Sequence, residues 1–247
     1  VRTARVGATP DRMGGMWAAL GWGAVAAGSV VIGALLALLR KWHHPTVGFV
    51  LAFGAGALIS SVAYELVEDG IRTSGPVPLG IGLALGALAF YLADRKVERM
   101  TSGGSGGVPL ALGALLDGIP EQLVLGIGLA SGGGVSLALL GSVFVSNLPE
   151  GLGSSAEMLE AGRSRRSVIG LWSLVAAACM LATLAGYALA EVLPEEVATG
   201  VNGFAAGALL VMLTDSMIPE AEQKAPGRAG LATVLGFALA MALSLLQ

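Results

Sequence analysis

Long apolar stretches separated by short polar or glycine-rich turns dominate the pattern of this chain. A helix that crosses about 30 Å of hydrocarbon needs about 20 mostly apolar residues. Eight stretches reach that length, so the pattern predicts an all-α, polytopic membrane protein with eight transmembrane helices in a single domain, 1–247. The predicted helices are 16–39, 46–68, 77–94, 108–130, 134–160, 167–191, 196–219 and 229–246.

The breaks between these stretches have the composition of turns. A polar turn covers 40–45, a second turn covers 73–76, a Gly/Ser linker covers 101–107 and a glycine turn covers 131–134. The first apolar stretch is too long for the core of a signal peptide. We therefore expect it to be a retained helix.

Composition supports a chain whose outer surface faces lipid. The sequence is 55% hydrophobic and 13% charged, whereas a soluble domain carries roughly 25% charged residues. The single cysteine, Cys179, excludes a disulfide framework and a zinc–thiolate site. The net charge is -3 and no basic run is present, so nucleic acid is not an expected partner.

Lys and Arg residues are divided unevenly between the two sides that eight crossings would create. Cytoplasmic loops of membrane proteins carry an excess of these residues. The N-terminus and the loop with Arg72 hold four of the 14, and the opposite loops hold the other ten. We therefore expect a multi-pass protein of the plasma (cytoplasmic, inner) membrane with both termini extracytoplasmic.

Two pairs of segments resemble each other within the chain. Residues 53–58 in the second predicted helix resemble 204–209 in the seventh, and 119–121 in the fourth resemble 148–150 in the fifth. Each pair would cross the membrane in opposite directions, which is typical of an inverted repeat, here arranged 3+2+3. Chance similarity between Gly/Ala-rich helices is the alternative.

Polar side chains interrupt the fourth and fifth predicted helices, where they are costly unless paired, hydrated or metal-bound. Asp117 and Glu121 are spaced i, i+4 and so share one helix face. The fifth helix carries Ser146, Asn147 and Glu150. At a rise of about 1.5 Å per residue both sets fall near the bilayer centre, where they could face each other.

A divalent cation would relieve the repulsion among these carboxylates in a dry environment. Pro120 and Pro149 each remove a backbone hydrogen bond, which frees the carbonyl oxygens of Leu116 and Val145 at the same depth. The alternative is that both prolines only kink helices for packing. We predict a metal site formed by Asp117, Glu121, Ser146, Asn147 and Glu150.

Further acidic residues are candidates for a cation pathway. Three would close the second helix on the outer side, two would close the seventh on the inner side, and one continues the polar stripe of the fifth. Ordinary helix-end charges in the headgroup zone are the alternative interpretation. The pathway candidates are Glu65, Glu68, Asp69, Glu157, Asp215 and Glu220.

The segments Asp117-Gly118-Ile119-Pro120-Glu121-Gln122 and Ser146-Asn147-Leu148-Pro149-Glu150-Gly151 resemble the ZIP family of divalent-metal transporters. The run 203–221 is also similar to that family. The resemblance covers nearly the whole chain and implies a divergent, bacterial-type member. It implies eight helices, external termini and metal-binding motifs in helices four and five.

The resemblance also implies roles for individual residues. Glu121 and Glu150 match the family's two metal-bridging glutamates, and Asn147 stands at the family's Asn/Asp position. Asp117 stands where the family has a histidine in its fourth helix. Ser146 stands where the family usually has His or Gln in its fifth helix. No histidine lies in any predicted helix. An all-oxygen site suits Mn²⁺, Mg²⁺ or Ca²⁺ and tolerates Fe²⁺, so zinc specificity is not implied.

The expected function is transport of a divalent metal (Zn²⁺, Mn²⁺ or Fe²⁺) into the cytoplasm by alternating access. The metal is the substrate, no organic cofactor is expected, and the protein is not expected to be an enzyme. The partners are the lipid bilayer and the metal, and glycine-rich residues 80–87 could pack within a protomer or in a homodimer. A non-transporting metal sensor is one alternative. An intramembrane hydrolase is another, although the catalytic motifs it needs are missing.

Overall fold

The computed structural model describes residues 12–101, 107–130 and 135–246, and all regular elements in these ranges are helical. The all-α prediction is therefore confirmed for this part of the chain. Most of the predicted linker at 101–107, the glycine turn at 131–134 and the N-terminal Arg2 and Arg5 lie outside the described residues.

Twelve elements form eight continuous helical segments in the described ranges. The second segment joins α2, the π-helix η1 and α3 without a break, and the seventh joins α8, the π-helix η2 and α9. The elements are α1 (Arg12–Leu39), α2 (His44–Ser61), η1 (Val62–Glu68), α3 (Asp69–Ser74), α4 (Pro76–Thr101), α5 (Gly107–Ala130), α6 (Leu137–Glu160), α7 (Arg165–Ala190), α8 (Glu195–Met212), η2 (Leu213–Met217), α9 (Ile218–Lys224) and α10 (Ala229–Ser244).

The second and seventh helices extend further than their apolar pattern predicts. They end at Ser74 and Lys224, six and five residues beyond the predicted ends at 68 and 219. Charged residues in these last turns pair along the helix instead of ending it. Arg72 Nη2 lies 2.6 Å from Glu68 Oε1, an i, i+4 pair that supports the helix.

The fifth predicted helix begins later than its apolar pattern suggests. The prediction is 134, whereas α6 begins at Leu137. Ser136 is the N-cap residue, and its side-chain oxygen accepts a hydrogen bond of 3.1 Å from the backbone N–H of Leu139. A serine that satisfies a free N–H group in the first turn is a common start signal.

Within the described residues, six helices are long and apolar enough to cross a membrane, which fits a multi-pass membrane protein. The other two long segments among the described residues differ for separate reasons. The polar residues of α6 lower its hydropathy, and α10 has only 16 residues. The six helices are Met13–Leu39, His44–Ser74, Pro76–Val97, Leu112–Ala130, Arg165–Ala190 and Glu195–Lys224.

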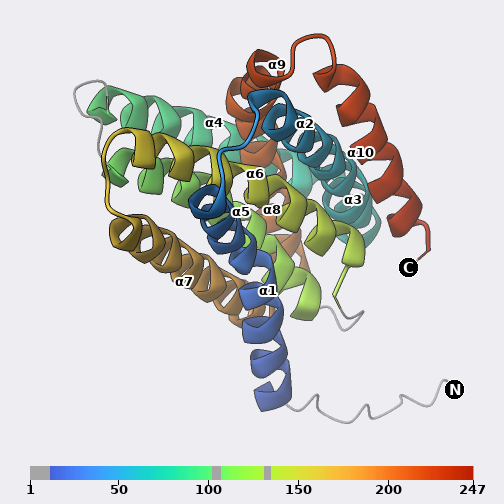
Figure 1. Ribbon diagram of the computed structural model, residues 1–247. Helices are drawn as coiled ribbons and strands as arrows, with labels where there is room; N and C mark the ends of the chain where they lie inside the picture. The colour runs from blue at the N-terminus through green and yellow to red at the C-terminus, as the bar shows by residue number, and fades with distance from the viewer. Residues whose placement is uncertain (1–11, 102–106, 131–134, 247) are drawn as a thin grey trace, which may run out of the picture.

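The helices pack largely in pairs, and α6 has neighbours on two sides. It contacts α1 on one side and α2 on the other. In Figure 1, α7 lies beyond α1 and α10 lies beyond α2, in agreement with the contacts α1–α7 and α2–α10. The pairs α5–α7 and α4–α8 complete the bundle. Ser146 and Asn147 of the polar stripe of α6 are therefore buried against protein, whereas Glu157 at the end of the stripe is exposed.

Glycines allow the backbones of α1, α2 and α6 to approach closely. A Cβ atom on Gly33 would overlap the carbonyl oxygen of Leu148, and one on Gly151 would overlap the carbonyl oxygen of Val30. On the α2 side, a Cβ atom on Gly54 would lie 2.7 Å from Ser146 Cα. These contacts hold the 146–151 segment of α6 against two neighbouring helices.

The second and seventh segments have the same order of helix types, an α-helix followed directly by a π-helix. Both α2 and α8 have 18 residues and are followed at once by a π-helix. Adding 151 to the numbers of His44 and Ser61 gives the first and last residues of α8, Glu195 and Met212. The same offset relates the similar sequences 53–58 and 204–209. Sequence similarity and backbone geometry therefore have the same register.

Candidate functional site

The two Pro-Glu motifs meet in the interior of the bundle. Pro120 lies inside α5 and Pro149 lies inside α6. Asn147 Nδ2 donates a hydrogen bond of 3.1 Å to Glu121 Oε2. Glu121 is 1% exposed and Asn147 is 5% exposed, so this bond joins α5 and α6 away from the surface.

A small cavity of about 40 Å³ lies beside this hydrogen bond. Liquid water occupies about 30 Å³ per molecule, so the space suits one water molecule or one ion without its hydration shell. All five residues predicted for the metal site line the cavity, together with residues of α2, α8, η2 and α9. The lining residues are Leu51, Asp117, Glu121, Ser146, Asn147, Glu150, Met212, Ser216, Met217 and Glu220.

Four carboxyl groups meet around this cavity and act on one another electrostatically. The charge of Asp117 acts on Glu121 and on Glu150, and that of Glu220 acts on Asp117 and Glu150. Leu51 supplies apolar wall. Charges interact more strongly where water is scarce, so the groups that line this cavity influence one another's ionisation.

The hydroxyl group of Ser146 is engaged within its own helix. Ser146 Oγ donates a hydrogen bond of 3.0 Å to the carbonyl oxygen of Val143. Since a hydroxyl oxygen also accepts hydrogen bonds or binds cations through its lone pairs, Ser146 can still contribute an oxygen atom to the cavity.

The carboxyl groups line one cavity without forming a coordination shell. In the part of the chain that the structure describes, no three His, Cys, Asp or Glu residues lie close enough together to hold a metal ion. Binding a metal here would require Asp117, Glu121 and Glu150 to move closer together.

The pathway candidates of the seventh segment and of α6 lie in different surroundings. Glu220 lines the same cavity as the five site residues. Asp215 is exposed, and its Oδ1 atom lies 3.5 Å from Thr214 Oγ1. Glu157 lines a separate, larger cavity. Of these three, the structure brings only Glu220 to the site.

The pathway candidates of the second segment are separate from the site. The Glu65 carboxylate accepts a hydrogen bond from Ser244 Oγ of α10, and Glu68 pairs with Arg72. Asp69 lines a cavity of about 400 Å³ with residues of α5, α7 and α8. None of the three lines the 40 Å³ cavity.

Two features of the site could not be found from the apolar pattern. In η2 the wider helical turn directs Ser216 and Met217 toward the cavity, and π-helical turns frequently occur at functional sites. Lys224 Nζ lies 2.5 Å from Glu220 Oε1. Their i, i+4 spacing in the sequence was an available signal for this pair.

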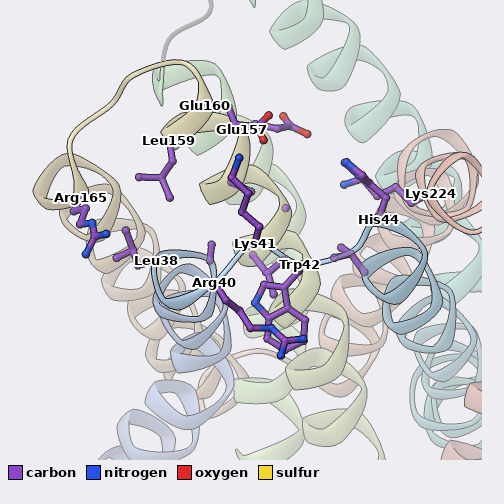
Figure 2. Close-up of a pocket in the computed structure, with 15 residues that line it drawn as sticks. Leu38, Arg40, Lys41, Trp42, His44, Glu157, Leu159, Glu160, Arg165 and Lys224 are labelled. Carbon is purple, nitrogen blue, oxygen red and sulfur yellow. The ribbon is translucent and has the colours of Figure 1, made fainter.

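A second cavity, of about 520 Å³, lies between the ends of α1, α2, α6, α7 and α9. Figure 2 shows Glu157 and Glu160 on its α6 side and His44 and Lys224 on its α2 and α9 side. The sequence predicts His44 in a loop, but it is the first residue of α2, directly before Pro45 at the favoured N-terminal position.

No model of a known protein family matches this sequence, and no curated protein matches it.

Proposed function

We propose that this protein is a divalent-metal transporter, similar to the ZIP family, that moves its substrate through the cavity between α5 and α6. The observation that carries this proposal is the meeting of four carboxyl groups around one cavity in an apolar bundle. Ionisable residues in such positions mark ion pathways in membrane proteins.

The proposal includes an eight-span topology with an inverted repeat. Its support is the common offset of 151 between the second and seventh segments, including the positions of η1 and η2. The contacts of α6 with α1 and α2 support a polar helix that crosses the membrane with Ser146 and Asn147 buried against protein. With both termini outside, the 520 Å³ cavity would open to the cytoplasm.

Transport by alternating access fits a cavity that is small and lined by carboxyl groups from several elements. A metal ion that enters would attract Glu121 and Glu150 toward itself, and the contribution of α5 and α6 to one site would couple binding to helix movement. Binding sites at the interface of repeated halves are common in secondary transporters.

The test is metal flux into proteoliposomes made with the purified full chain. Entry of Mn²⁺ or Zn²⁺ above that of protein-free vesicles, with saturation at high metal, is the expected result. A protein that binds these ions in equilibrium dialysis but moves none would instead be a metal-binding membrane protein, and the transport proposal would be rejected.

Selectivity among metals provides a further prediction. Oxygen donors from carboxyl, amide and hydroxyl groups line the cavity, and such donors do not favour zinc over manganese as imidazole and thiolate do. We expect Mn²⁺ uptake within about tenfold of Zn²⁺ uptake, measured by competition in the same vesicles. A preference for zinc of tenfold or more would contradict metal binding by the oxygen donors alone.

A further inference from the structure

One ion pair lies between the two cavities. Lys224 Nζ lies 2.5 Å from Glu220 Oε1. Glu220 lines the 40 Å³ site cavity, whereas Lys224 lines the 520 Å³ cavity. The ion pair therefore joins the wall of one cavity to the wall of the other.

The backbone of α6 leaves room for the ammonium group at this point. A Cβ atom on Gly153 would lie 3.0 Å from Lys224 Nζ and 4.0 Å from Glu220 Oε1. Gly153 follows Glu150 by three residues, so the lysine approaches the same face of α6 as the site glutamate. The Lys224 side chain is 15% exposed, and that of Glu220 is 47% exposed.

Charge explains how this pair could respond to a metal. Lysine carries a compact charge on a flexible stem, and ion pairs with an exposed partner are weak. A divalent cation that reaches Glu220 has twice the charge of the ammonium group and is also attracted by Asp117 and Glu150, whose carboxyl groups interact with Glu220. The metal can therefore replace Lys224 as the partner of Glu220.

We propose that Lys224 is an internal cation that closes the route between the two cavities by binding Glu220, and that a divalent metal must displace it to pass. This inference rests on the proposed transport function. The displaced ammonium group has a destination in the larger cavity, where Glu157 and Glu160 line the opposite side (Figure 2). Lys224 thereby links passage to the charge of the ion.

Accessibility of the site cavity tests this inference without any measurement of flux. Cys179 is replaced by serine, Ser216→Cys places a single thiol in the cavity lining, and the protein is held in lipid nanodiscs. Two methanethiosulfonates are compared, one cationic (trimethylammonium-ethyl) and one anionic (sulfonatoethyl). An opened route speeds both reactions, whereas a changed local potential speeds one and slows the other.

In this background, Lys224→Gln is expected to speed labelling at least about fivefold with both reagents. Lys224→Arg retains a cation and is expected to stay within about twofold of the parent. Lys41→Gln is the matched control, because it removes a lysine from the same large cavity but from the α1–α2 connection. If Lys224→Gln does not fold, Glu220→Gln breaks the same pair and should give the same acceleration.

Metal addition separates this inference from the transport function. With Lys224 present, Mn²⁺ should speed labelling, and in Lys224→Gln it should add nothing. Equal labelling of Lys224→Gln and the parent, or equal acceleration by Lys41→Gln, would overturn the inference, as would a parent that does not respond to Mn²⁺. Fast labelling of Lys224→Gln with a normal Mn²⁺ response but no flux would reject transport and leave the displaceable lysine supported.

Discussion

Replacement of Glu150 or Glu121 with glutamine is expected to lower divalent-metal uptake at least about 100-fold in proteoliposomes. Glutamine keeps the size of the side chain but removes a negative charge from the cavity. Even partners outside the ligand shell commonly contribute 10–100-fold to metal affinity, so loss of a charged ligand should exceed that range. Initial rates of Mn²⁺ entry, normalised to reconstituted protein, measure the effect.

The two glutamates should differ in a second property. Glu121 also accepts the hydrogen bond from Asn147. Alanine would leave that buried donor without its acceptor, so Glu121→Ala should lower thermal stability more than Glu150→Ala when both are heated in detergent. Glu196→Gln is the control, since Glu196 is exposed in the first turn of α8 and should retain uptake within about twofold. Uptake by either site variant at the wild-type rate would refute this cavity as the metal route.

Replacement of Gly151 with alanine is expected to destabilise the protein and lower uptake together. The new methyl group would overlap the backbone of α1 at Val30, and a backbone carbonyl cannot rotate away as a side chain can. Overpacking of this kind typically costs about 1–3 kcal/mol. The midpoint of thermal aggregation, followed by size-exclusion chromatography in detergent, should fall by several degrees.

The matched control for this substitution lies in the same helix. No atom lies within 4 Å of the position that a Cβ atom on Gly141 would occupy. Alanine is a better helix former than glycine by about 1 kcal/mol, so Gly141→Ala should be neutral or stabilising. If Gly141→Ala and Gly151→Ala lowered the midpoint equally, close contact between α1 and α6 would not be what holds the motif in position.

Close packing and the site chemistry are connected through α6. Gly33 and Gly54 let α1 and α2 contact the backbone at Leu148 and Ser146, which lie one and three residues before Pro149 of the second Pro-Glu pair. If α6 moved and carried Glu150 with it, its backbone would have to slide past the contacts with Gly33 and with Gly54. The glycines that position this motif therefore also define the path along which it could move.

The sequence by itself determined the helical class, the approximate helices and the candidate residues of the site. Apolar runs of membrane-spanning length leave no other regular structure available, because a backbone in lipid must satisfy its own hydrogen bonds. The carboxyl groups were recognisable because Asp117, Glu121 and Glu150 are costly in such runs. The spacing of apolar and acidic residues along the sequence was sufficient for these inferences.

Only the tertiary structure decided which of the acidic residues meet. Glu220 and Asp215 are five residues apart, look alike in the sequence and are both exposed, yet only Glu220 lines the site cavity. The π-helix η2 lies between α8 and α9 and changes which residues face inward. Asn147 meets Glu121, and Lys224 reaches the boundary between two cavities, only because of how separate helices pack. The periodicity of apolar residues carries no information about that packing.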